Sequence, residues 1–483
     1  MSKDYDSLMS THPIYEKMIG RWIYLLNSFM GGDKYRKAGY LTRYSYESEI
    51  DYEERLRQTP LDNHCKAIVS IYNAFLFRNG VEREMESIEN DPALNPFMKD
   101  ADLDGRNLNN FMKDVSTYSS IFGHCWIVVA KPNSNARTRA EELSQEIRPY
   151  LNLITPLNVL DWKWKRAPSG YHYLTYIKYV EDSEYKGHKV IKEWTEEQII
   201  TTITDDEKEE IDEVITEVNG LGVIPAIPVY TQRSPYRGIG VSDIEDISDH
   251  QRKIFNELSE IEQAIRVNGH PSLVKTPDVE ANAGAGAIVQ IPNELDPGLK
   301  PYMLTVETDT DSIYNSIQQS VDAIDRMANT GAVRAKSTRT LSGVAMEVEF
   351  SMLSARLSEK ADNLELAEEH MWRIWCQYQG KVWDGEIYYP DSFNIRDIDR
   401  EYDQLAKAKN TASNPKINRV IDERILTLMD EDYKEVLGEE EEFQPHMMYS
   451  PDGVGVEAYT YEEHINLANK GYTHEKPGSE SDV

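Results

Sequence analysis

The sequence predicts an α+β protein that is mainly helical. Residues 341–378 contain no proline, and their apolar residues recur at drifting helical spacing over roughly ten turns. Residues 124–230 are instead rich in β-branched and aromatic residues interrupted by turns, which favours antiparallel strands. Two more helical segments, 242–267 and 309–328, flank a stretch rich in Gly and Pro. Together these patterns predict helices built around a smaller sheet region.

The composition argues against several classes of protein. The chain has 483 residues and a formal net charge of −32, which disfavours a surface that wraps nucleic acid, because phosphates are bound by clustered Lys and Arg. The charge alone leaves two interpretations open: simple solubility, or a surface that nucleic acid passes without sticking. No window of about 18 apolar residues predicts a membrane helix, and no secretory signal is expected at the N-terminus. Cys65, Cys125 and Cys376 fit no zinc site, so free thiols in a reducing compartment are expected.

The N-terminal part of the chain alternates between helices and breaks. Residues 1–30 and 107–122 have helical periodicity. Residues 47–80 predict two helices that flank Pro60, the second ending at Gly80.

The sheet region begins with a short buried strand, Trp126–Ala130. Further strands are predicted by the stretches LNLITPLNVLDWKW, YHYLTYIKYVE and HKVIKEWTEEQIITTIT. The acidic run 205–213 predicts a solvated hairpin tip or loop. The prolines of NGLGVIPAIPVY, which ends at Tyr230, suit an edge strand.

The helix at 242–267 has its own start and stop signals. Ser242 and Glu245 form a predicted capping box, and the sequence NGHP stops the helix. Residues 268–308 are then predicted to be a small β-containing insertion. Acidic residues in the first turn of the helix at 309–328 suit the helix dipole.

The long helix at 341–378 would measure roughly 57 Å. Its heptad repeat is not strict, so a spine that crosses several layers is favoured over a coiled coil. After Gly380, the stretch KVWDGEIYYPDSF predicts a hairpin, and residues 397–437 predict two or more helices. The tail from residue 443 is expected to be irregular and mobile at its end.

The sequence carries no recognisable catalytic motif. It contains no Gly-x-x-x-x-Gly-Lys-Ser/Thr, no His-Glu-x-x-His, no Cys-x-x-Cys and no Gly-x-Ser-x-Gly. The stretch AGAGAIV, around Gly284 and Gly286, lacks the third glycine of a dinucleotide motif and predicts a simple turn. We therefore expect a protein that is not an enzyme, without catalytic residues, metal site or cofactor.

The order of these elements resembles the portal proteins of tailed bacteriophages. Four stretches carry the resemblance: YEERLRQTPLDNHCKAIVSIYNAFLF, NGLGVIPAIPVY, GIGVSDIEDI and RTLSGVAMEVEFSMLSARLSEKADNLE. It covers most of residues 40–380 and is looser beyond them. The family implies a ring of twelve copies in the virion, assembled in the host cytoplasm at one capsid vertex. Double-stranded DNA would pass through this ring without being read in sequence. Its implied partners are further copies, the terminase motor, a head–tail adaptor, and the major capsid and scaffolding proteins, with no membrane.

The resemblance also divides the chain into regions. It implies a wing at 1–241, stem helices at 242–267 and 309–328, a clip at 268–308, a tunnel loop at 329–340, a spine helix and wing return at 341–396, and a crown with a flexible tail at 397–483.

Two groups of residues are candidate sites within these regions. Arg334, Lys336 and Arg339 are expected to face DNA in the tunnel loop, or else to be solvated charges or to pair with acids of a neighbouring subunit. The clip residues expected to bind partners are Lys275, Asp278, Glu280, Glu294 and Asp296. A solvated hairpin is the alternative for the clip. The alternative for the whole protein is a non-viral helical scaffold, or an enzyme on the central α/β patch.

Overall fold

The computed structural model contains two compact units, residues 1–394 and 395–483, which are described separately. The structure describes residues 4–132, 136, 138–182, 187–269, 272–274, 296, 301–304, 309–334, 343–390, 393, 402, 405–409, 415–428, 446–452, 454–458 and 461–473. None of the helices within these residues has an apolar stretch of bilayer-spanning length.

The first unit opens with short helices that are capped by their own side chains. They are α1 Tyr5–Met9, α2 Pro13–Met30, α3 Gly32–Lys37, α4 Glu49–Gln58, α5 His64–Leu76, the 3₁₀ turn η1 Glu86–Ile88, α6 Leu94–Lys99 and α7 Leu108–Phe122. Four of these helices have a side-chain N-cap: α1, α4, α5 and α7. In each, a side-chain oxygen of the N-cap residue accepts a hydrogen bond from the backbone N–H three residues later. The N-cap residues are Asp4, Ser48, Asn63 and Asn107. The two predicted helices around Pro60 are confirmed, although the second ends at Leu76, before Gly80.

The predicted antiparallel patch is two separate sheets. Strand β2, His124–Ala130, is buried along its whole length and lies between β3, Tyr150–Ile154, and β9, Ala226–Tyr230. The edge position predicted for the proline-containing strand is therefore confirmed. The second sheet is a five-stranded meander formed by β4 Val159–Arg166, β5 His172–Asp182, β6 His188–Thr195, β7 Gln198–Asp205 and β8 Glu210–Val218. Helix α8, Arg139–Ser144, connects β2 and β3.

Strand β8 corrects the prediction for the acidic run 205–213. Only residues 206–209 form the turn, and residues 210–213 already belong to the strand. The strand lies at the sheet edge and is exposed along most of its length, so its sequence lacks the apolar signal of a buried strand.

Helix α9, Ile247–Gly269, starts later than the sequence predicts. The Ser242 hydroxyl donates to the backbone oxygen of Ile121 at 2.7 Å, so it ties this segment to the end of α7. The carboxylate of Glu245 pairs with Arg21 at 2.6 Å. Tertiary partners thus occupy both members of the predicted capping box, and the helix begins only at Ile247.

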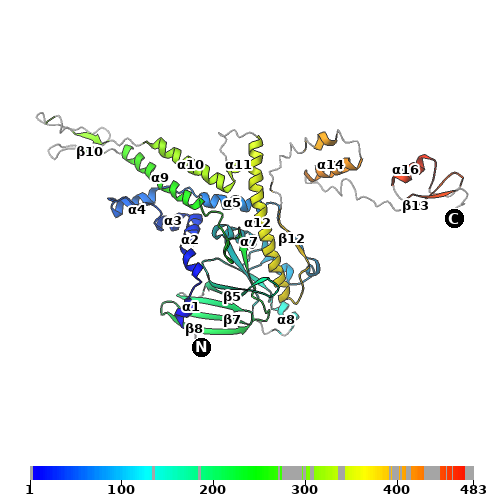
Figure 1. Cartoon of the computed structure of the whole chain (residues 1–483), viewed down its shortest axis with the longest axis horizontal. Helices are drawn as coiled ribbons and strands as arrows, with labels where there is room; N and C mark the ends of the chain where they lie inside the picture. Colours follow the sequence, from blue (N-terminus) through cyan, green and yellow to red (C-terminus); the bar gives the residue numbers. More distant parts are fainter. Residues whose placement is uncertain are drawn as a thin grey trace. The chain divides into compact units, whose positions relative to one another are not determined.

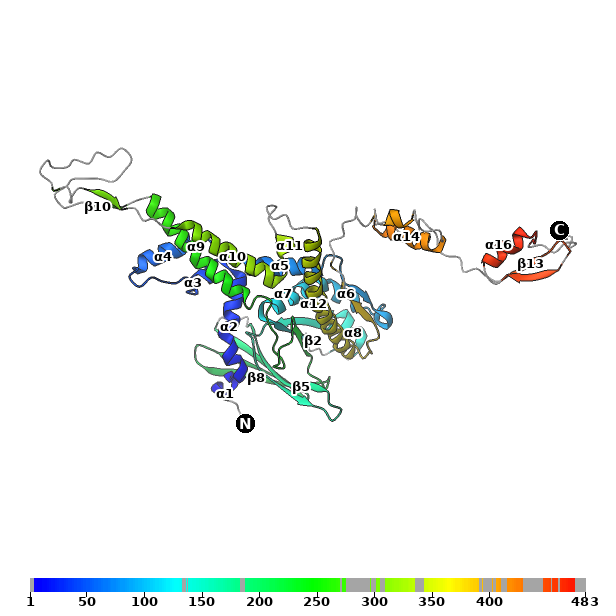
Figure 2. The same cartoon turned by 45° about the horizontal axis from the view of Figure 1, so that its top comes forward.

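Helix α10, Thr310–Ala328, packs along α9, and both views show the two helices side by side (Figures 1 and 2). Asp309 caps α10, as the acidic start predicted. Between the helices, β10 Ser272–Val274 pairs antiparallel with β11 Tyr302–Leu304. The third predicted β-like run, at 287–291, lies outside the described residues.

The long helix α12, Gly343–Tyr378, has 36 residues and measures roughly 54 Å. A short helix, α11 Gly331–Arg334, precedes it. Its buried positions include Leu353, Leu357, Leu364, Met371 and Trp375, and it packs against α5, β2, β9 and β12. The predicted layer-crossing helix is confirmed, starting at Gly343.

The hairpin predicted after Gly380 is wrong. Strand β12, Glu386–Tyr388, pairs with the distant β1, Glu82–Glu84. Contacts with α12 explain why these two strands pair. The guanidinium of Arg83, on β1, bonds the buried carboxylate of Glu368 on α12. The same carboxylate accepts from the hydroxyl of Tyr389, which follows β12, at 2.6 Å.

The second unit contains helix α14, Pro415–Leu428, and a helical stretch at 405–409. The expectation of an irregular tail from residue 443 is wrong for residues 446–473. Strands β13 His446–Tyr449 and β14 Gly455–Ala458 form a hairpin that is followed by α16 Tyr461–Asn469. Backbone hydrogen bonds between Tyr449 and Thr473 close this small fold.

Candidate functional site

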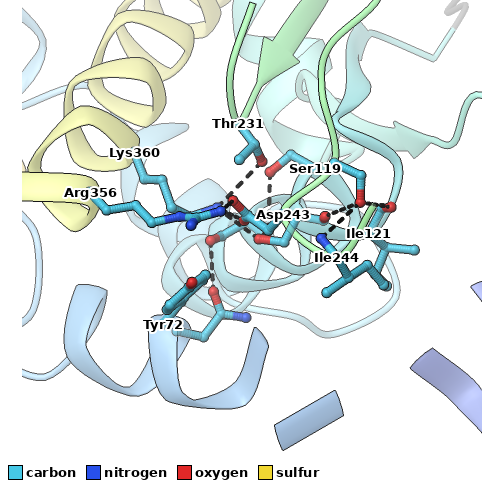
Figure 3. Close-up of polar contacts among 12 residues, drawn as sticks. Tyr72, Ser119, Ile121, Thr231, Asp243, Ile244, Arg356 and Lys360 are labelled. Atoms are coloured by element: carbon cyan, nitrogen blue, oxygen red, sulfur yellow. Dashed lines mark hydrogen bonds and ion pairs between the residues drawn. The ribbon is translucent and has the colours of Figure 1, made fainter. Parts of the chain in front are cut away.

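A largely buried cluster of charged side chains joins α12 to the segment just before α9. The Asp243 carboxylate accepts from Lys360 Nζ at 2.6 Å and from the Arg356 guanidinium at 3.1 Å. The Asp243 and Lys360 side chains are only 3% and 4% exposed. Figure 3 shows both cations reaching from α12 toward Asp243. Burial opposes ionisation of Asp243, but Lys360 and Arg356 outweigh it and lower the pKa of this carboxyl.

The same cluster holds the end of α10. Arg356 also donates to the backbone oxygen of Met327 at 2.9 Å, and the Tyr72 hydroxyl donates to that of Ala328 at 2.7 Å. The Arg356 guanidinium lies 5.3 Å from the centre of the Tyr72 ring. A cation and a hydroxyl therefore bind carbonyls at the C-terminus of α10, where the helix leaves them unpaired. The ends of both hairpin helices are fixed to one place on α12.

The segment before the cluster is positioned by two glycines. Gly123 has a φ of +84°, and a Cβ on Gly240 would lie 1.9 Å from the Gly123 oxygen. Only two residues without side chains allow this approach. The contact brings the chain from β9 back across the start of β2, three residues before Asp243.

Arg334 is held within the chain. Its guanidinium pairs with Asp325 at 2.6 Å and contacts His64 Nδ1 at 2.7 Å, and its side chain is 18% exposed. Burial and the nearby Arg334 lower the pKa of His64, so its neutral imidazole can accept this bond. The predicted tunnel loop at 329–340 thus begins with a folded turn. Lys336 and Arg339 lie outside the described residues.

The exposed face of α10 is mostly polar. Residues at helical spacing on this face include Asp311, Asn315, Gln318, Asp322 and Arg326. Gln318 donates to Asp322 at 2.9 Å. The face offers two amides, two carboxylates and one guanidinium, with no cluster of cations along the described helix.

Of the five clip residues predicted to bind partners, only Asp296 is described, and it is exposed. Lys275, Asp278, Glu280 and Glu294 lie outside the described residues. The clip group therefore stays a prediction.

Sequence reasoning missed the Asp243 cluster. Arg356 and Lys360 are four residues apart on a predicted helix, so their shared face could have been noticed. Their partner lies more than a hundred positions earlier, and a single sequence carries no sign of that pairing.

His188, Asp205 and Asp212 lie close enough together to hold a metal ion. However, His188 pairs with Asp212 at 3.0 Å, and Asp205 pairs with Lys208 at 2.5 Å. The Asp205 carboxylate thus already has a cation of the protein itself as its partner. The three cysteines are free and buried, as the sequence predicted.

The fold is of the mixed α+β class, and in it a helical hairpin is anchored by ion pairs to a long helix beside two sheets. The chain belongs to the SPP1 Gp6-like family of phage portal proteins, whose family model matches residues 34–411. The protein is thus a component of the virion, at the portal vertex of the capsid, and it self-assembles into a ring. The family match decides against a non-viral scaffold, and the family is structural.

Solved structures with a similar arrangement come from gene transfer agent (GTA) particles. One is the neck of an empty GTA particle computed with C6 symmetry, with TM-score 0.45, 10% identity, and coverage of 81% of this chain and 99% of that chain. Another is the virion of a native GTA particle, with TM-score 0.44, 11% identity, and coverage of 83% and 98%. No curated protein matches the chain.

Proposed function

We propose that the protein forms a ring of twelve copies around a channel for double-stranded DNA, which enters during packaging and leaves during ejection. The observation that carries this proposal is the α9–α10 hairpin, whose two ends are fixed to α12 through Asp243 and Arg356. A hairpin anchored in this way is suited to line a channel without being dragged by the moving DNA.

We propose the same division of the chain that the resemblance implies. We assign residues 1–241 to the wing, 242–267 and 309–328 to the stem, 268–308 to the clip, 329–340 to the tunnel loop, 341–396 to the spine and wing return, and 397–483 to the crown. In this assignment the polar face of α10 faces the channel. A channel lined with cations would bind phosphates and resist movement, whereas a face of amides and mostly acidic charges binds them weakly.

The tunnel loop supplies the few positive contacts. Arg334, Lys336 and Arg339 are its proposed DNA-facing cations. Because Asp325 already balances Arg334, Lys336 and Arg339 are expected to contribute more to phosphate binding.

The clip is the proposed docking platform for the terminase motor and the head–tail adaptor, through Lys275, Asp278, Glu280, Glu294 and Asp296. The wing would contact the major capsid and scaffolding proteins. The protein would hold these partners without catalysing a reaction itself.

Negative-stain imaging and native mass measurement of the full chain test the ring. We expect a particle with a central hole and a mass twelve times the 55.6 kDa of one copy. A stable monomer or dimer at micromolar concentration, with scaffolding protein also present, would contradict the proposal.

A further inference from the structure

A second feature, distinct from the charge cluster, is a cleft of about 630 Å³ between β9, the β4–β5 hairpin and the C-terminal half of α12. Both views show this part of α12 beside the sheets (Figures 1 and 2). Apolar side chains line part of the cleft, and they include Leu174, Ile224, Ile227, Pro228 and Ile374.

Arginines line the same cleft. Arg233 lies 5.4 Å from the centre of the Tyr230 ring, and Arg237 lies 5.9 Å from that of Trp164. Both arginines are exposed, and neither pairs with a carboxylate in the described part of the chain. Arg373 adds a third guanidinium, which is paired with Glu369 at 2.6 Å. The aromatic rings hold the first two guanidiniums in place without neutralising them.

The positive charge of this cleft contributes to a lowered pKa at two histidines. Burial lowers the pKa of His172, and Arg237 lowers it further. Burial likewise lowers the pKa of His370, and Arg373 and Arg233 add to the effect. Cations from the β9–α9 segment and from α12 therefore act on the same space, in a chain whose formal net charge is −32. Glu196 is the single acidic residue in the described lining.

We propose that this cleft binds an acidic peptide segment of another protein, with carboxylates on Arg233 and Arg237 and a bulky apolar side chain against the apolar lining. Charge complementarity supplies the first contact, because guanidiniums bind carboxylates strongly. The apolar lining supplies the second. The inference does not depend on the proposed DNA channel.

Two observations favour a peptide over nucleic acid. A DNA duplex presents phosphates but no apolar side chain to cover Pro228 or Ile374, which are only partly buried. The rings of Tyr230 and Trp164 already lie beside arginines, which hinders the stacking used by proteins that bind single strands.

The mode of binding is also constrained. Pro228 lies on the edge strand β9 and has no N–H to offer, which disfavours extension of the sheet by an added strand. The peptide would therefore be recognised through its side chains.

Fluorescence anisotropy with the full chain tests the proposal. The probe is a labelled twelve-residue peptide of alternating Glu and Leu, compared at pH 7 with twelve-residue poly-Glu and with a 20-base-pair duplex. We expect the Glu/Leu peptide to bind about tenfold tighter than either comparison ligand, and more weakly as salt rises.

The matched variants are Arg233→Ala/Arg237→Ala and the control Arg57→Ala/Arg78→Ala, which removes two exposed arginines from α4 and the segment after α5. The cleft variant should lose about tenfold in peptide affinity, and the control should lose less than about twofold. Circular dichroism establishes that each variant is folded, and Arg233→Lys/Arg237→Lys gives a second, milder test that should bind at an intermediate level.

Three results would overturn the proposal. In the first, the duplex binds as tightly as the peptide. In the second, poly-Glu binds as tightly as the Glu/Leu peptide. In the third, the cleft variant changes ring assembly while leaving peptide affinity intact, which would mean that a second copy covers the cleft.

Discussion

At the residue scale, Asp243 is the most informative position. The Asp243→Asn change leaves the buried Lys360 and the partly exposed Arg356 without their counter-charge, so we expect a loss of about 3–5 kcal/mol in the free energy of unfolding. Asp249→Asn is a matched control, because the Asp249 side chain is largely exposed and its pair with Arg21 should contribute less than about 1 kcal/mol. Urea unfolding of both variants measures the difference. Equal losses would mean that the buried cluster is not an anchor.

The buried imidazole of His124 predicts that the free energy of unfolding depends on pH. Burial lowers its pKa from 6.5 to about 3, so the folded state keeps the imidazole neutral while the unfolded state binds a proton below pH 6.5. This contribution to stability is complete above pH 6.5 and is lost as the pH falls toward 3. Between pH 7 and 5 the loss should be roughly 2 kcal/mol.

The His124→Asn variant removes this titration. Its free energy of unfolding should fall by roughly 2 kcal/mol less than that of the unchanged protein between pH 7 and 5. The same change at His172, on the rim of the cleft and only half-buried, should alter the pH dependence in the same direction but by less. Parallel curves for His124→Asn and the unchanged protein would contradict the interpretation.

At the element scale, the crossing of β2 and the segment before α9 depends on Gly240. An added methyl group would lie 1.9 Å from the Gly123 oxygen, and we expect Gly240→Ala to cost about 3 kcal/mol or more. Gly20→Ala is the control, because Gly20 lies inside α2 with nothing within 4 Å of its Cβ position. That change should stabilise the protein by roughly 0.5–1 kcal/mol. Thermal unfolding should therefore shift in opposite directions.

The elements that the sequence predicts well are those with local signals. The long helix ending at Tyr378 and the helix ending at Ala328 follow from periodicity and capping, and both are present. The errors arise where distant partners decide the structure. Ser242 looks like a helix cap but bonds α7 instead, and β12 looks like half of a local hairpin but pairs with β1.

The candidate site divides in the same way. The resemblance identified the segment containing Arg334, but only the structure shows its pairing with Asp325. The Asp243 cluster could be found only from the three-dimensional contacts, since no sequence spacing rule connects Asp243 to Lys360.

At the scale of the whole molecule, the proposed ring predicts separate roles for the cations of the tunnel loop. Lys336→Ala/Arg339→Ala should reduce DNA packaging or retention and leave ring formation and stability intact, because these residues are proposed to touch only phosphates. Arg334→Ala should instead lower the unfolding temperature, because it leaves Asp325 without its partner.

Three measurements on the same variants separate these effects: the amount of DNA packaged per particle, ring formation seen by negative stain, and the temperature of thermal unfolding. Arg57→Ala provides the matched control, since Arg57 is an exposed arginine on α4, in the region assigned to the wing. Loss of rings in Lys336→Ala/Arg339→Ala would make those residues structural. Unchanged stability in Arg334→Ala would mean that its bonds to Asp325 and His64 do not hold the base of the loop.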